Sequence, residues 1–161
     1  MKRDQMVKAL NINSLSTYVW IHHVVLPKFP TSDYSGAADA YFKYVENGGG
    51  GNGLETPATT MQVPYYLNVT MGWDASSRCG CTSSYWMAHQ SPYPFGPVMV
   101  NNTPYQFKKY LAKAKLLTML KPQNQRIIMI NSWNEWGEGS YLEPDMINGM
   151  QYLNAIKDVF S

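Results

Sequence analysis

The stretch that decides the fold is residues 127–139, IIMINSWNEWGEG. Its first four residues form a continuous apolar run, which is typical of a strand buried on both faces of a parallel sheet. Two glutamates, Glu135 and Glu138, follow where this run ends. Side chains three residues apart share a face only where the chain coils, so we predict that the pair lies on a turn. The two glycines of the stretch allow the backbone to turn sharply enough to present both carboxylates to one cleft.

Two carboxylates beside large aromatic side chains are suited to cutting a glycosidic bond. One carboxyl group gives a proton to the leaving oxygen, and a second carboxylate handles the charge that develops at the sugar carbon. An isolated Glu-x-x-Glu is usually a solvated surface pair. Here Trp133, Trp136 and Tyr141 flank the acids, and a protein gains little from exposing such aromatics unless a ligand binds there. We therefore predict that Glu135 and Glu138 are catalytic.

Strands and helices alternate along the whole chain. After the end of a helix at Arg3–Leu10, β-rich or apolar segments predict strands at 16–21, 63–71 and 127–130. Helical patterns follow each strand, at 37–45, 103–121 and 152–160. With right-handed crossovers this order predicts an α/β fold with a parallel sheet of about three strands. A complete (β/α)8 barrel needs about 200–250 residues, so we expect a part of such a barrel.

Two long segments lie between these elements. Residues 46–62 contain a run of glycines and are predicted to be a flexible insertion. Residues 79–100 are predicted to be a long cleft loop, and three of its aromatic side chains are candidates for lining sugar subsites: Trp86, Tyr93 and Phe95. Cys79 and Cys81 are too close for an ordinary disulfide and lack the second half of a zinc site, so we expect free thiols.

Three motifs carry a resemblance to a known family. The first is WNEWGEG at 133–139 followed by YLEPD at 141–145, the second is MGWD at 71–74 with Arg78, and the third is STYVW at 16–20. Together they resemble the signatures of the WbsX-like proteins, whose domain is related to glycoside hydrolase family 99. The motifs correspond to the carboxyl-terminal portion of that barrel domain. The resemblance therefore implies that the whole chain, residues 1–161, is this portion.

The resemblance implies a reaction. Characterised family 99 members are retaining enzymes that act on α-mannosides and require no metal, and we expect neither metal nor cofactor here. The first glutamate of their motif is thought to deprotonate the sugar 2-hydroxyl, whose oxygen then attacks the anomeric carbon of the same sugar. Glu135 matches this glutamate. The second, matched by Glu138, acts as general acid and then as base. The charge of Glu135 and an aromatic wall are expected to raise the pKa of Glu138. Gly137 departs from the family pattern, which commonly has histidine there.

The expected substrate-binding residues are polar or aromatic side chains at predicted strand ends and beside the acidic pair. Arg78 is expected to bind a sugar hydroxyl or to hold Glu135 ionised, unless it forms a structural pair with Asp74. Of two adjacent histidines, one is expected to be structural. The complete set is Tyr18, Trp20, His22, Trp73, Asp74, Arg78, Asn134, Trp136, Tyr141 and Glu143.

Composition argues against other partners. The formal charge is +2 and no basic run exceeds Lys2-Arg3, so neither nucleic acid nor an anionic membrane is expected. No apolar stretch approaches the length of a membrane span. The expected substrate is an oligosaccharide or polysaccharide. Two alternatives stay open: a glycosyltransferase of polysaccharide synthesis, and a sugar-binding fragment whose open sheet edges need the amino-terminal half of the barrel or a second copy.

Overall fold

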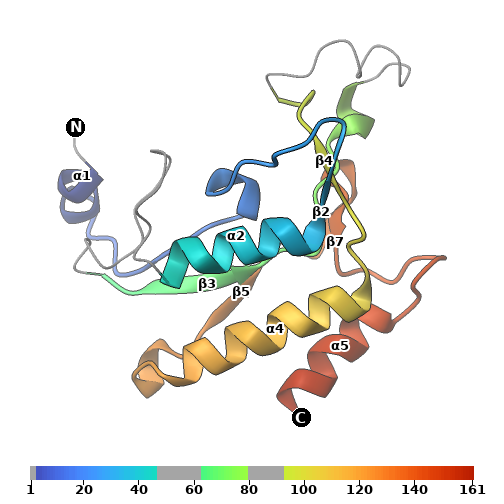
Figure 1. The fold of residues 1–161 in the computed structure, drawn as a ribbon. Coiled ribbons are helices and arrows are strands. Elements are labelled where there is room, and N and C mark those ends of the chain that lie inside the picture. Colours follow the sequence, from blue (N-terminus) through green and yellow to red (C-terminus); the bar gives the residue numbers. More distant parts are fainter. Residues whose placement is uncertain (1–2, 47–62, 80–92) are drawn as a thin grey trace.

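The computed structural model describes residues 3–46, 63–79 and 93–161 (Figure 1). Most of the predicted insertion at 46–62 and of the predicted loop at 79–100 lies outside these ranges, as do Cys81 and Trp86. None of the helices within the described ranges combines the length and the apolar character that a bilayer crossing needs.

The centre of the fold is a parallel sheet of three strands in the order β1-β3-β5. Its strands are β1 (Leu15–Ser16), β3 (Tyr65–Val69) and β5 (Ile128–Ile130). The register sets Val69 opposite Ile130, so β3 and β5 end at the same level. The predicted parallel α/β sheet is confirmed, with shorter strands than expected. That the chain is part of a (β/α)8 barrel remains a prediction, because the three strands form an open sheet.

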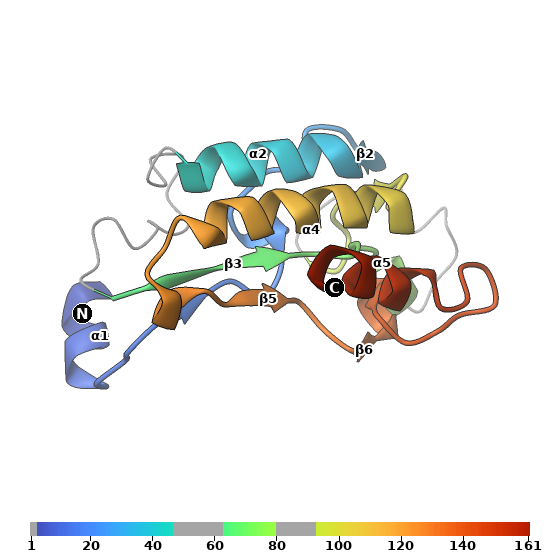
Figure 2. The same ribbon diagram turned by 90° about the horizontal axis from the view of Figure 1, so that it is seen from below.

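Helices alternate with these strands as predicted. The two longest cover one face of the sheet (Figure 2). Helix α4 begins as its sequence indicates, because the Thr103 hydroxyl accepts a hydrogen bond from the backbone N–H of Gln106 at 3.3 Å. It ends at Met119, two residues before the predicted end at Lys121. The helices are α1 (Arg3–Ala9), α2 (Tyr34–Glu46), α4 (Pro104–Met119) and α5 (Gln151–Phe160).

Several short elements were not predicted from the sequence. Strand β2 (Thr31–Asp33) pairs in parallel with β4 (Val98–Val100), so the end of the predicted loop at 79–100 is a strand instead. Strand β6 (Asn134–Glu135) pairs antiparallel with β7 (Ser140–Tyr141). Four 3₁₀ turns complete the described elements: Trp20–His22, Ser76–Cys79, Gln123–Gln125 and Trp136–Glu138.

The core between the sheet and α2 is rich in aromatic rings. Trp20 is fully buried, with its ring 5.1 Å from that of Tyr34 and 5.6 Å from that of Tyr41. Its indole N–H donates to the carbonyl oxygen of Asn68 at 3.0 Å. The strand predicted at 16–21 ends at Ser16, and Trp20 begins a 3₁₀ turn instead. Trp20 has no accessible surface in this structure and so offers none to a sugar, contrary to its predicted binding role.

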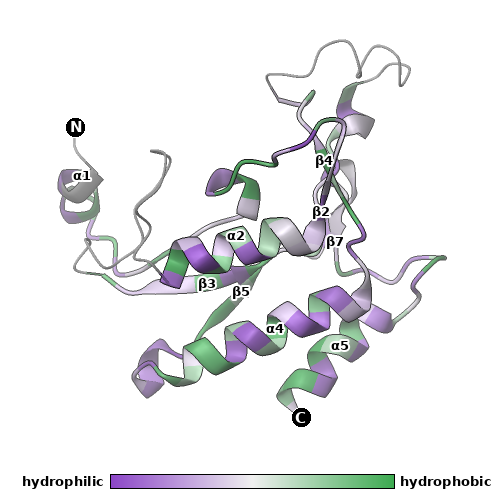
Figure 3. Ribbon diagram, in the orientation of Figure 1, coloured by the Kyte–Doolittle hydropathy of each residue, from purple (hydrophilic) through white to green (hydrophobic). Residues whose placement is uncertain are grey.

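Strand β5 differs most from its sequence pattern. We predicted burial on both faces, but Ile128 and Ile130 are half-buried and Met129 is 41% exposed. The reason is position, since within the described residues β5 is an outer strand that pairs with β3. Along α4 and α5, hydrophilic and hydrophobic residues alternate (Figure 3). On α5 the buried side includes Tyr152 and Val159, whereas Phe160 at the end of the helix is 49% exposed.

Candidate active site

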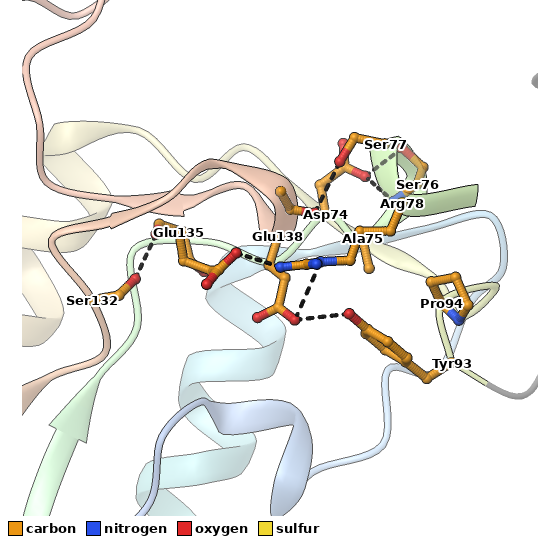
Figure 4. Close-up of polar contacts among 12 residues, drawn as sticks. Asp74, Ala75, Ser76, Ser77, Arg78, Tyr93, Pro94, Ser132, Glu135 and Glu138 are labelled. Carbon is orange, nitrogen blue, oxygen red and sulfur yellow. Dashed lines mark hydrogen bonds and ion pairs between the residues drawn. The ribbon is translucent and has the colours of Figure 1, made fainter. Parts of the chain in front are cut away.

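The acidic pair lies on a hairpin beyond the carboxyl end of β5. Glu135 closes β6, and Glu138 closes the 3₁₀ turn that follows. Gly139 then adopts a left-handed backbone with φ of 59°, which returns the chain into β7. The predicted turn is confirmed, and Figure 4 shows both carboxylates approaching one guanidinium group, that of Arg78.

The two glycines of this hairpin have different roles. A Cβ atom at Gly139 would lie 2.9 Å from Cβ of Asp74, so the turn demands both the unusual φ and the missing side chain. Gly137 is outside the left-handed region. A Cβ atom there would lie 3.2 Å from Cζ and Nη2 of Arg78. The prediction that both glycines bend the chain is therefore right for Gly139, whereas Gly137 leaves room for a guanidinium group.

The motif at 71–78 and the motif at 133–139 form one unit. The backbone N–H of Asp74 donates to the carbonyl oxygen of Glu138 at 2.7 Å, and the hydroxyl of Ser77 donates to that of Gly137 at 2.9 Å. The Asp74 carboxylate accepts from the backbone N–H of Ser76 at 2.9 Å and from its hydroxyl. Asp74 thus caps the turn that carries Arg78.

Arg78 connects the two acids. Its Nη2 forms a charge-assisted hydrogen bond with Oε1 of Glu135, and its Nε lies 3.7 Å from Oε1 of Glu138. The side chains of Arg78 and Glu135 are 41% and 36% exposed. Arg78 and Glu135 therefore form the expected ion pair, and the alternative pair of Arg78 with Asp74 is not formed.

Glu138 has a more enclosed environment than Glu135. Its side chain is 13% exposed. Tyr93 donates to Oε1 at 2.9 Å, and Tyr18 donates to Oε2 at 3.0 Å. Burial, together with the hydrogen bond to Glu138 and its charge, raises the pKa of Tyr18 to about 12. Similar causes raise the pKa of Tyr93. Both phenols are therefore protonated at neutral pH.

Aromatic rings beside the acids differ in accessibility. Trp136 stacks on Tyr141 with ring centroids 3.7 Å apart, and its indole N–H donates to Oε2 of Glu143 at 2.6 Å. Trp136 is nevertheless 47% exposed, so a fixed aromatic surface remains open. Trp73 is 6% exposed and lies 6.1 Å from the ring of Tyr93. Trp73 therefore has little ring surface to offer a sugar, contrary to its predicted stacking role.

The other predicted binding residues lie at the margin. His22 is exposed, with its ring 6.2 Å from that of Tyr18, and Asn134 is exposed on β6. Sequence reasoning placed Tyr93 among loop aromatics but did not predict its contact with Glu138. No motif joins these two residues, which are 45 positions apart. Within the described ranges, no cluster of three or more His, Cys, Asp or Glu side chains is arranged to hold a metal ion.

Comparison with known proteins agrees with these motifs. A family described as Glycosyltransferase WbsX matches residues 54–156. Two curated relatives, both called uncharacterized protein WxcX, come from two strains of Xanthomonas campestris pv. campestris and are each 31% identical over 97 residues. The aligned region covers 60% of this chain but 12% of each relative. No solved structure matches significantly.

Proposed function

This chain belongs to the WbsX glycosyltransferase family, and we propose that it carries the acid pair of an enzyme that cleaves glycosidic bonds in α-mannosides or related glycans. The observation that carries the proposal is the shared guanidinium: Arg78 contacts Glu135 and approaches Glu138, while phenols enclose Glu138. Glu135 is thereby in direct contact with a cation, whereas Glu138 is hydrogen-bonded by neutral phenols and lies 3.7 Å from the same cation. Such unequal surroundings suit two carboxylates with different roles.

In the proposed reaction, Glu135 is the base, and its carboxylate contacts the guanidinium group of Arg78. It removes the proton of the sugar 2-hydroxyl, whose oxygen attacks the neighbouring anomeric carbon. The bond from that carbon to the leaving oxygen breaks, and Glu138 gives the leaving oxygen a proton. Water then attacks the anomeric carbon and breaks its bond to the 2-oxygen. Glu138 takes a proton from this water, and Glu135 returns its proton to the 2-oxygen. Substrate participation distinguishes this route from one with an enzyme nucleophile.

The sugar ring is proposed to stack on the open face of Trp136. Stacking on a ring whose position is already fixed avoids part of the entropy cost of binding. Around this face, polar groups would bind hydroxyls in the proposed site; they are Tyr18, His22, Asp74, Arg78, Asn134, Tyr141 and Glu143.

The second candidate function is glycosyl transfer, and the family description favours it. A transferase could use the same acids, with an acceptor hydroxyl in place of water. The decisive experiment incubates the full-length protein with α-mannan and related glycans, with and without a nucleotide sugar, and analyses the products. New reducing ends without a nucleotide sugar support hydrolysis. Product that forms only with the nucleotide sugar supports transfer, and sugar binding without any product would contradict both enzymatic functions.

Participation of the 2-hydroxyl has its own test. An α-mannoside that lacks this hydroxyl should bind but not react, whereas one that lacks the 6-hydroxyl should still be cleaved, because only the former removes the attacking group. Equal cleavage of the 2-deoxy substrate and its parent would exclude the proposed role of Glu135.

A further inference from the structure

We infer that Tyr18 and Tyr93 form a clamp that positions the carboxyl group of Glu138 for proton transfer. The structural part of this inference stands on geometry alone, and its catalytic consequence rests on the proposed function. Neither tyrosine was predicted from sequence to act on Glu138.

Each phenol holds a different oxygen of the same carboxyl group. The distances are 2.9 Å from Tyr93 to Oε1 and 3.0 Å from Tyr18 to Oε2, both within the ordinary range for O–H···O bonds (Figure 4 shows the Tyr93 contact). The two tyrosines come from different parts of the chain, one following β1 and the other preceding β4. Two donors that grip both oxygens restrict rotation of the carboxyl plane more than one donor can.

The backbone of Glu138 is fixed as well. Its carbonyl oxygen accepts from the N–H of Asp74 at 2.7 Å, so both ends of the residue are held. Glu135 provides the contrast, since its carboxylate contacts Arg78 and its side chain is 36% exposed, against 13% for Glu138. The clamp therefore acts selectively on one member of the pair.

Phenols are chemically suited to an acid that changes its protonation state. A tyrosine hydroxyl both donates and accepts, whereas a guanidinium only donates. The clamp can donate to the Glu138 carboxylate and accept from its protonated form, so the same contacts persist through the cycle. Because burial and Glu138 raise the pKa of Tyr18 to about 12, its phenol keeps its proton throughout this exchange at neutral pH.

The test compares Tyr18→Phe, Tyr93→Phe and the double variant of the full-length protein, with Tyr105→Phe as the matched control because Tyr105 is 75% exposed on α4. Loss of positioning is expected to lower kcat about 10-fold in each single variant and about 100-fold in the double variant. KM should stay nearly unchanged in Tyr93→Phe, whereas in Tyr18→Phe it should also rise because Tyr18 is a proposed sugar-binding group. The limb of the pH–rate profile that reports the acid should also shift. A double variant that folds normally and retains wild-type kcat and pH profile would overturn the clamp.

A second measurement is independent of activity. Tyrosine ionisation is followed by ultraviolet absorbance in the wild type, in Glu138→Gln and in Tyr18→Phe, the last of which identifies the Tyr18 signal. Removing the charge of Glu138 should move the ionisation of Tyr18 to lower pH. An unchanged Tyr18 titration would refute the contact whatever the enzyme does. If the Tyr18 titration shifts in Glu138→Gln but the wild type processes no glycan, the contact of the clamp is supported and the proposed function is contradicted.

Discussion

Two tryptophans show how differently the core and the acidic hairpin use similar residues. Trp20 is fully buried and donates to the backbone carbonyl of Asn68, whereas Trp136 is 47% exposed and donates to the carboxylate of Glu143. Both rings stack on a tyrosine. The difference is that Trp20 directs its entire surface into the protein, while Trp136 stacks on Tyr141 and keeps about half of its surface accessible.

This comparison separates stability from binding. Burial of a large apolar ring supplies free energy of folding in proportion to its area. A ring held half-exposed supplies less, and the exposed area is the part available to a ligand. The two carboxylates of the hairpin bond to side chains from other segments, namely Arg78, Tyr18 and Tyr93.

The largest expected effect comes from the core. Trp20→Ala should lower the free energy of unfolding by about 3–5 kcal/mol, because it leaves a large cavity and an unpaired carbonyl at Asn68. Trp136→Ala is the matched variant and should cost less than about 1 kcal/mol while weakening glycan binding. Urea unfolding and glycan titration measure the two quantities. Equal losses of stability in both variants would erase the distinction between the two regions.

Gly139 tests the hairpin itself. Gly139→Ala should cost about 1–2 kcal/mol for the left-handed backbone and about 1–3 kcal/mol for the close approach to Asp74. Gly149 is a matched control, since its φ of 53° is similar and an added Cβ meets nothing within 4 Å. Gly149→Ala should therefore show the backbone cost alone. A similar loss in both variants, measured by chemical unfolding, would mean that the contact with Asp74 is unimportant.

Alkaline pH provides a comparison of two phenols. Two tyrosines have a pKa raised to about 12, Tyr41 in the core and Tyr18 in the site. Burial is the main cause for Tyr41, whereas burial and the neighbouring Glu138 raise the pKa of Tyr18. A raised pKa means that the folded state holds the proton more tightly, so stability is complete below pH 10 and declines as pH rises towards about 12. Unfolding measured across this window should show that decline. In Tyr18→Phe the slope should be shallower, and an unchanged slope would contradict the raised pKa of Tyr18.

The smallest effect on stability is expected at Gly137. Gly137→Ala places a methyl group against the guanidinium of Arg78, a flexible side chain that can move away, so the free energy of unfolding should change little. Turnover should fall instead, because Arg78 would shift relative to Glu135. Gly36→Ala is the control, as an added Cβ there meets nothing within 4 Å. If Gly137→Ala turns over at the wild-type rate, the position of Arg78 is not needed for the reaction.

Much of the fold was predictable because local patterns determine it. The cap at Thr103 and the alternation of strand and helix depend on neighbouring residues, and both are confirmed. The failures involve contacts between distant residues. Trp20 was read as a strand-end ligand because its sequence position does not reveal that the chain coils inwards, and β5 was read as central although it is an outer strand in the described sheet.

The candidate site was predictable to a similar extent. Glu135 and Glu138 were proposed as candidates from their spacing and flanking aromatics, and the contact of Arg78 with Glu135 was one of the alternatives that the sequence left open. The contact between Tyr93 and Glu138 was not predictable, since it depends on where a long segment returns to the hairpin. Pattern can identify a charged pair, but the neutral groups around it are fixed by tertiary structure.

The most direct measurement compares turnover and sugar binding in Glu138→Gln and in Glu46→Gln, whose carboxylate pairs with Lys113 on the helices. Glu138→Gln should reduce turnover by at least about 10²–10⁴-fold and leave sugar affinity nearly unchanged, because it removes the proton donor but keeps the shape of the side chain. Glu46→Gln should retain full turnover. Normal turnover in Glu138→Gln would contradict the assignment of this hairpin as the catalytic site.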